Sequence, residues 1–241
     1  DGTVQPAASF AAAGSPGAIT AGDFDRDGRL DVAVATGRGA TVLMGINDGE
    51  LASCEITSNA SCTTNAASPL VAILDEAIGI ERAVLNTVHA YTASQALVDS
   101  PSKKDLREGR AAAQNIIPSS TGAAIAVTKA YPALAGKFDG IAIRVPIIVG
   151  SLVDLTFVSA RPTSVEEVNG ALKAAAAAER WHGLFAVTEE PLVSSDIIGA
   201  TVAAIADLSS TLVVDATLVK ALAWYDNETG YTHTLVEHVA A

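Results

Sequence analysis

The sequence is poor in cysteine, aromatic residues and positive charge. Its two cysteines, Cys54 and Cys62, are too few for a disulfide scaffold. Lysine and arginine together number 15 against 27 acidic residues, which gives a formal net charge of −12. Such a negative chain argues against nucleic acid and anionic membrane surfaces as partners. No apolar run is long enough to span a bilayer, so we expect no membrane partner.

What the sequence does have is enough apolar residues to build a core. Hydrophobic residues make up 49% of the 241 positions, which excludes a disordered chain. This length allows one large domain or two unequal ones. The sequence begins at Asp1 with neither Met nor a signal-peptide pattern, so we expect it to be part of a longer reading frame.

The character of the sequence changes near residue 50. Before it, β-like runs at 30–36 and 40–45 flank a Gly-rich turn and predict a hairpin. After it, longer apolar patterns predict helices and strands without regular βαβ alternation. We therefore expect a β segment over 1–51, followed over 52–241 by an α+β domain with a mixed or antiparallel sheet and helices on one face. The predicted helices are 68–78 and 164–180, the latter opened by Ser164; the predicted strands are 83–91, 139–147, 151–160, 201–207, 211–214 and 218–225.

Cys62 lies in "SNASCTTNAAS", where a strand-like segment gives way to a helix. Ser61, Thr63 and Thr64 are all suitable N-cap residues. A thiol at that position faces free backbone N–H groups and the positive end of the helix dipole, and both favour the thiolate. The alternative is that Cys62 is a small buried hydrophobic residue.

His89 ends a predicted strand in "NTVHAYTAS". An imidazole beside the cysteine could activate it and serve as general acid or base. The alternative is a histidine that only packs or lies on the surface. Further along, Lys103, Lys104, Arg107 and Arg110 precede a hydroxyl-rich turn at 119–122, and Arg144 lies within an apolar strand. Guanidinium and hydroxyl groups suit phosphate oxygens, although 103–110 also fits a solvated charged loop.

These stretches resemble a known family. "SNASCTTN", "TVHAYTASQ", "IIPSSTGAA", "IRVP", "VDLTF" and "WYDNETGYT" follow the order and spacing of the catalytic domain of glyceraldehyde-3-phosphate dehydrogenase. The resemblance implies that Cys62 is the nucleophile and His89 its acid–base partner. It also implies the remaining site residues: Thr92 and Arg144 for the phosphate of the substrate, Ser61, Arg107, Thr121 and Gly122 for the attacking phosphate, Thr63 among the substrate-binding residues, and Asn227 and Tyr231 beside the nicotinamide.

The resemblance further implies the reaction and the partners. Glyceraldehyde 3-phosphate and inorganic phosphate would be converted to 1,3-bisphosphoglycerate through a cysteine thioester, with NAD or NADP taking the hydride. A homotetramer in the cytoplasm is the expected assembly. The sequence contains no G-x-G-x-x-G fingerprint, and only 61 residues precede Cys62. We therefore expect the dinucleotide-binding domain to be missing, and neither tight cofactor binding nor dehydrogenase turnover by this chain alone.

The stretch "DFDRDGRLD" points to a different activity. It resembles the calcium loop of an FG-GAP-type, integrin-like propeller repeat, with Asp23, Asp25, Asp27 and Asp31 as carboxylate ligands. An acidic hairpin turn without metal is the alternative. A second functional hypothesis follows: a non-catalytic fusion or binding module, in which a calcium-binding β-repeat precedes a degenerate dehydrogenase domain.

Overall fold

The computed structural model describes residues 16–22, 31–36, 39–43, 56–102 and 105–240. The chain divides into two compact units, residues 1–59 with 239–241, and residues 60–238. Within the described ranges, no helix is both long and apolar enough to cross a membrane.

The first unit contains a four-stranded antiparallel sheet. Its strands lie in the order β1 (Pro16–Gly22), β2 (Asp31–Thr36), β3 (Gly39–Leu43) and β4 (Ile56–Ser58). The predicted hairpin is confirmed, because β2 and β3 pair with Val34 opposite Thr41. The proposed calcium ligands Asp23, Asp25 and Asp27 lie outside the described residues, and for Asp31 only the backbone, at the start of β2, is described.

The second unit is built on a seven-stranded sheet in the order β6-β7-β5-β8-β11-β10-β9. The β5–β7 and β9–β10 pairs are parallel and the other pairs antiparallel, so the predicted α+β class with a mixed sheet is confirmed. The strands are β5 (Ile80–Ala90), β6 (Ile117–Ser120), β7 (Phe138–Val145), β8 (Ser151–Ser159), β9 (Phe185–Thr188), β10 (Ala204–Val214) and β11 (Leu218–Tyr225).

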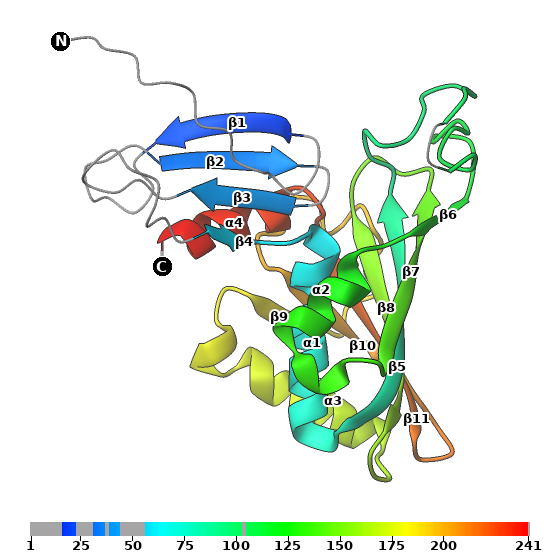
Figure 1. Cartoon of the computed structure of the whole chain (residues 1–241). Coiled ribbons are helices and arrows are strands. Elements are labelled where there is room, and N and C mark those ends of the chain that lie inside the picture. Colours follow the sequence, from blue (N-terminus) through cyan, green and yellow to red (C-terminus); the bar gives the residue numbers. More distant parts are fainter. Residues whose placement is uncertain (1–15, 23–30, 37–38, 44–55, 103–104, 241) are drawn as a thin grey trace, which may run out of the picture. The chain divides into compact units, whose positions relative to one another are not determined.

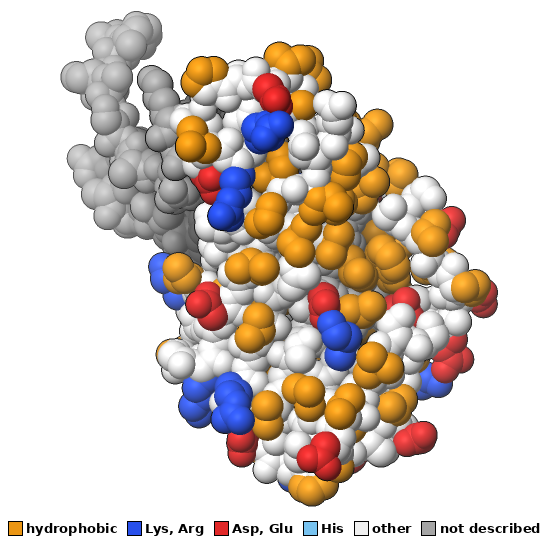
Figure 2. All heavy atoms as spheres, turned by 90° about the vertical axis from the view of Figure 1, so that its right-hand side faces the viewer, with side chains coloured by type: hydrophobic (Ala, Val, Ile, Leu, Met, Phe, Trp, Pro, Cys, Tyr) orange, Lys and Arg blue, Asp and Glu red, His pale blue; other side chains and the backbone are white. Residues whose placement is uncertain are grey.

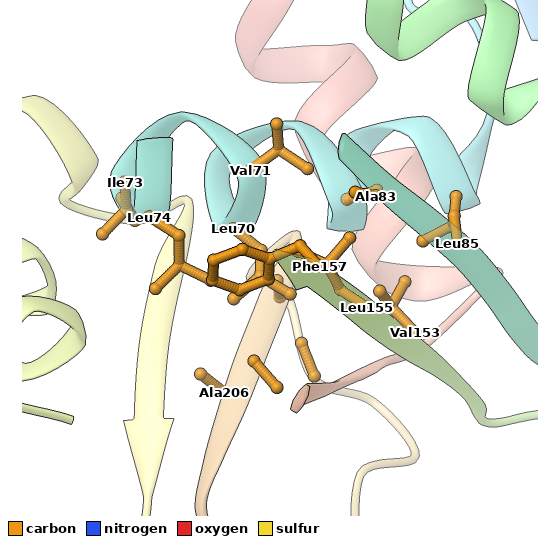
Figure 3. Packing of buried hydrophobic residues seen from close by; sticks show 14 of the residues in the cluster. Leu70, Val71, Ile73, Leu74, Ala83, Leu85, Val153, Leu155, Phe157 and Ala206 are labelled. Atoms are coloured by element: carbon orange, nitrogen blue, oxygen red, sulfur yellow. The ribbon is translucent and has the colours of Figure 1, made fainter. Parts of the chain in front are cut away.

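Three helices, α1 (Cys62–Ile78), α2 (Ala123–Ala130) and α3 (Val165–Ala176), cover one face of this sheet (Figure 1). A fourth, α4 (Thr229–Ala240), follows β11. Alternate residues of β8 point toward α1, where Leu155 and Phe157 pack with Leu70 and Leu74 (Figure 3). All four side chains are at most 1% exposed. Burial of each contributes roughly 1.5–3 kcal/mol, so α1 is held rigidly over the strands that carry the site.

Some predicted boundaries were wrong. The runs 201–207 and 211–214 form one strand, β10, whose register shifts between Asp207 and Leu212. There the Asp207 carboxylate accepts the backbone N–H groups of Ser209 and Ser210. These bonds satisfy the N–H groups of residues that lie within the register shift. The helical run predicted over 68–78 extends back to Cys62, where the sequence places the change from strand to helix, and α3 ends at Ala176 before a separate 3₁₀ turn. The Ser164 cap is confirmed, since its hydroxyl accepts the N–H of Glu167.

Candidate active site

Cys62 is the first residue of α1, as the sequence predicted. Ser61 is the N-cap residue, and its hydroxyl accepts the backbone N–H of Thr64 at 3.1 Å. The Ser61 carbonyl accepts the N–H of Asn65 at 2.9 Å. These bonds fix the first turn of α1, so the position of the thiol relative to the sheet is set by the packed helix.

His89 lies on the strand beneath this helix end. Its Nε2 atom is 3.4 Å from the Cys62 sulfur, and the side chain is only 4% exposed. The alternating burial of β5 turns His89 toward the helix-covered face, the same face as Thr87 and Leu85. The fold therefore brings together the two residues that the sequence separates by 27 positions.

Arg144 is the third member of this cluster. It lies on β7 directly opposite His89, because the parallel β5–β7 register pairs the two residues. Its Nη1 atom is 2.5 Å from His89 Nδ1 and 3.2 Å from the carbonyl oxygen of Ala90. The guanidinium is partly buried. A cation enclosed in this way is suited to hold an anion beside the cysteine.

The electrostatics of the site bear on the two alternatives for Cys62. Burial raises the pKa of the Cys62 thiol above its usual value of 9.0, although the N–H of Thr63 and the charge of Arg144 act in the opposite direction. Burial and the nearby Arg144 lower the pKa of His89 to about 4. At neutral pH these shifts favour a thiol and a neutral imidazole, so desolvation opposes the thiolate that the helix N-terminus favours, in the direction of the buried-cysteine alternative.

Tyr225 completes the site, and sequence reasoning missed it. Its hydroxyl lies 2.8 Å from the hydroxyls of both Thr63 and Thr87. Its ring meets the His89 ring edge-on, with 5.9 Å between centroids. Tyr225 is 1% exposed, so these bonds satisfy a buried hydroxyl and fix α1 against β5. Its place within "WYDNE", two residues before Asn227, was the only signal in the sequence. Thr63, predicted to bind substrate, uses its hydroxyl inside this network.

Asn227 is anchored by its side-chain oxygen. Oδ1 accepts the N–H of Gly150 and the hydroxyl of Ser151, each at 3.0 Å. Because a backbone N–H can only donate, the amide orientation is fixed, and the NH₂ group is the end left for a ligand. Ser151 also accepts the N–H of Ala90, which ties Asn227 to the strand that carries His89. Tyr231 is partly buried within α4.

The remaining predicted residues lie on loops and helix ends. Thr92 follows β5, and its hydroxyl contacts Ser94 at 3.0 Å. The Thr121 hydroxyl accepts the N–H of Ala123, and Gly122 is the N-cap of α2. Arg107 is exposed. The hydrogen bonds of the described residues join none of these four to the Cys62–His89 pair. In the same part of the chain, no group of three or more His, Cys, Asp or Glu side chains could hold a metal ion.

Comparison with known proteins decides the family. Residues 61–227 match the family described as "glyceraldehyde 3-phosphate dehydrogenase, C-terminal domain". The chain belongs to the glyceraldehyde-3-phosphate dehydrogenase family. It is 48% identical over 202 residues to the glyceraldehyde-3-phosphate dehydrogenase of Geobacillus stearothermophilus, covering 83% of this chain and 60% of the relative. It is 49% identical over 209 residues to that of Mycobacterium avium, covering 86% and 61%.

The match to the dehydrogenase family covers the whole cluster described above, from Ser61 to Asn227. The chain spans about 60% of the length of these curated relatives. The family assignment therefore concerns this domain, and it does not by itself give the chain the activity of a complete glyceraldehyde-3-phosphate dehydrogenase.

Proposed function

We propose that residues 60–238 form the catalytic domain of a phosphorylating glyceraldehyde-3-phosphate dehydrogenase. The observation that carries this proposal is the contact of 3.4 Å between Cys62 and His89, with the Arg144 guanidinium against the far side of the imidazole. A nucleophile, a base and an anion-binding group in one buried cluster are the parts that oxidation of a phosphorylated aldehyde needs.

The cysteine and histidine divide the chemistry between them. Cys62 adds to the aldehyde carbon of glyceraldehyde 3-phosphate, and the thiol proton passes through His89 to the new alkoxide. His89 then accepts the hydroxyl proton as hydride leaves this thiohemiacetal, giving a thioester on Cys62. Inorganic phosphate attacks the thioester, 1,3-bisphosphoglycerate leaves, and the thiolate is freed. Arg144 and Thr92 hold the phosphate of the substrate, and Ser61, Thr121, Gly122 and Arg107 receive the attacking phosphate.

The cofactor proposal rests on Asn227. When bound, NAD or NADP supplies the hydride acceptor. The Asn227 oxygen already accepts two hydrogen bonds, so its NH₂ group is oriented to donate to a carbonyl such as that of a carboxamide. Tyr231 lies one turn further along the chain, in α4. The remainder of the dinucleotide needs a phosphate-binding fingerprint that this sequence does not contain.

The proposal is tested without the cofactor, by acylating the cysteine with p-nitrophenyl acetate. We expect mass spectrometry to find a thioester on Cys62 and none in Cys62→Ser. In His89→Asn the acylation should be about 10²–10⁴-fold slower, because the base is lost. Inorganic phosphate should shorten the life of the thioester and release acetyl phosphate. Cys54→Ser is the matched control and should acylate normally; a protein that never acylates at Cys62 would instead be a non-catalytic module.

We also propose that the open face of the seven-stranded sheet binds a second copy of the chain, as expected for a homo-oligomer. Figure 2 looks onto this face and shows hydrophobic side chains gathered there. The exposed apolar residues that point away from the helices are Val84, Ile141, Leu212, Val214 and Leu218. Exposed apolar patches of this kind often mark the surface through which two protein molecules associate.

Two further proposals rest on the sequence. A domain that works through a free thiol suits the reducing cytoplasm. The loop with Asp23, Asp25, Asp27 and Asp31 is the proposed calcium site of an FG-GAP-like segment. Millimolar calcium should then raise the melting temperature, and Asp25→Asn with Asp27→Asn should abolish the rise; an unchanged melting temperature in the parent protein would eliminate this proposal.

A further inference from the structure

Ser61 and Thr64 are joined by two hydrogen bonds at the start of α1. Ser61 is the N-cap residue, and its Oγ atom accepts the backbone N–H of Thr64 at 3.1 Å. The two hydroxyl oxygens also lie 2.7 Å apart, an ordinary distance for a bond between hydroxyls. Either hydroxyl could donate in this second bond, and its direction decides what Ser61 can offer to a ligand.

The burial of Thr64 fixes the direction of the second bond. Thr64 is 6% exposed, and among the described residues its hydroxyl has no hydrogen-bond partner other than Ser61 Oγ. If Ser61 were the donor, the hydroxyl proton of Thr64 would be buried without an acceptor, which is destabilising. Ser61 is only partly buried, so its own proton can reach a group outside the helix. Thr64 is therefore the donor and Ser61 the acceptor.

Ser61 then has a single hydrogen-bonding role left. A hydroxyl has two lone pairs and one proton. The lone pairs of Ser61 Oγ accept the N–H and the hydroxyl of Thr64, and no group in the described part of the chain takes the proton of Ser61. Ser61 can therefore donate to an anionic oxygen, but it cannot accept from a P–OH group.

We propose that Thr64 is a positioning residue for the attacking phosphate, and that it acts by making the Ser61 hydroxyl a donor only. The inference rests on the proposed function, which assigns Ser61 to that phosphate. Ser61 directly precedes Cys62, so a phosphate held by Ser61 lies close to the sulfur that carries the thioester. One anionic oxygen of hydrogen phosphate bonds to the acyl carbon, the C–S bond breaks, and the sulfur of Cys62 leaves as thiolate.

This role concerns cleavage of the thioester and not its formation. Formation uses Cys62 and His89, and neither of their side chains is hydrogen-bonded to Thr64. Cleavage needs the proton of Ser61 to point at the phosphate. In Thr64→Val the backbone N–H still caps the helix on Ser61, but one lone pair of Ser61 is freed and its hydroxyl is no longer held in one orientation. Thr64→Ser keeps the donor.

The test is the phosphate dependence of thioester cleavage in a single turnover. Cys62 is acetylated with p-nitrophenyl acetate, the excess reagent is removed, and the release of acetyl phosphate is followed at increasing concentrations of inorganic phosphate. The phosphate constant is the concentration that gives half of the maximal rate. It should rise about 10-fold in Thr64→Val, the effect of weakening one hydrogen bond to a charged group.

Two further variants show that this change is specific. Thr64→Ser should restore the phosphate constant of the parent protein, and acetylation of Cys62 without phosphate should proceed at the parent rate in both Thr64 variants. Thr128→Val is the matched control for removing a helical threonine hydroxyl, because Thr128 donates to the Ile125 carbonyl within α2. It should leave the phosphate constant unchanged. An unchanged constant in Thr64→Val would overturn the inference.

A double-mutant cycle shows whether Thr64 acts through Ser61. Ser61→Gly removes the hydroxyl and keeps a residue that suits an N-cap. In that background Thr64→Val should have no further effect on the phosphate constant, because the group that it orients is gone. An equal effect of Thr64→Val with and without the Ser61 hydroxyl would show that Thr64 acts by another route, and the inference would be wrong.

The outcomes separate this inference from the proposed function. If Ser61→Gly raises the phosphate constant and Thr64→Val does not, the proposed phosphate site stands and the inference fails alone. If phosphate does not accelerate cleavage of the thioester in the parent protein, the proposed phosphate site fails and the inference fails with it.

Discussion

At the scale of single residues, the chemistry of the site depends on how burial acts on one thiol and one imidazole. Burial raises the pKa of Cys62 and lowers that of His89 to about 4, so both groups are neutral at pH 7. A cysteine protease-like ion pair, with a thiolate already formed, would show the opposite shifts. In the proposed mechanism, His89 therefore takes the thiol proton during the reaction and not before it.

This assignment predicts the pH dependence of Cys62 alkylation by iodoacetamide. The thiolate is the reactive form, so a raised pKa means that the rate keeps increasing as the pH rises from 6 through 9. The alkylation rate should show no separate rise near pH 6.5, because His89 is already deprotonated above about pH 4. Peptide mapping restricts the measurement to Cys62. A rate that is constant between pH 6 and 8 would mean that the thiolate exists in the resting protein.

Sequence patterns predicted the positions of the candidate residues better than their surroundings. The helix-start pattern around Cys62 and the strand end at His89 marked the two residues as candidates, and the family resemblance implied their roles as nucleophile and base. Tyr225 could not be predicted in the same way, because its partners Thr63 and Thr87 come from distant segments. The sequence shows the helix N-terminus, which favours the thiolate. It does not show the desolvation that raises the pKa of Cys62, because desolvation depends on what packs around the sulfur.

At the scale of helices and strands, the turn from α1 into β5 determines how the cysteine and histidine meet. Gly79 ends α1 with a φ of +78°, and its N–H closes the helix on the Asp75 carbonyl. The next residue, Ile80, starts β5 and donates its N–H to the Asp75 carboxylate at 2.6 Å. The helix that carries Cys62 and the strand that carries His89 are thus joined by one residue of left-handed backbone.

Gly79→Ala should therefore destabilise the domain by more than the backbone strain alone, because the new methyl group also overlaps a neighbouring side chain. A Cβ at this position would lie 2.6 Å from the Cβ of Ala160. The left-handed backbone costs roughly 1–2 kcal/mol and the overlap a further 1–3 kcal/mol, so we expect a loss of about 2–5 kcal/mol in urea unfolding. Gly136→Ala is the matched control, because its φ is +76° and a Cβ there would meet nothing within 4 Å. Equal losses in the two variants would contradict the packing argument.

Long periodic elements were predictable, and short or irregular ones were not. The patterns that predicted β5, β7, β8, β11 and α3 reflect burial on one side of each element, which a single segment reveals. The four-residue strands β6 and β9 and the helix α2 are too short for a clear period. The break within β10 depends on Asp207 accepting neighbouring N–H groups, a local arrangement that a hydrophobic pattern does not encode.

At the scale of the whole molecule, one face of the seven-stranded sheet is covered by helices and the other is not. Register places Val84, Thr156, Lys220 and Leu212 in one row across this open face. Lys220 pairs with Asp154 at 2.5 Å within it, so the face combines apolar area with a fixed ion pair. A surface of this composition fits association with another copy of itself better than exposure to water.

Ile141→Arg tests this association. Ile141 lies on β7 with 51% of its surface exposed, and a charge there would be buried without a partner when two sheets meet. We expect the dissociation constant from sedimentation velocity to rise by about 100-fold, or roughly 2.8 kcal/mol. The matched control is Ile125→Arg: Ile125 is 64% exposed but lies on α2, on the helix-covered side, and its substitution should leave the constant unchanged. If both variants dissociate equally, or if the parent protein is monomeric at all concentrations, the open sheet face is not the interface.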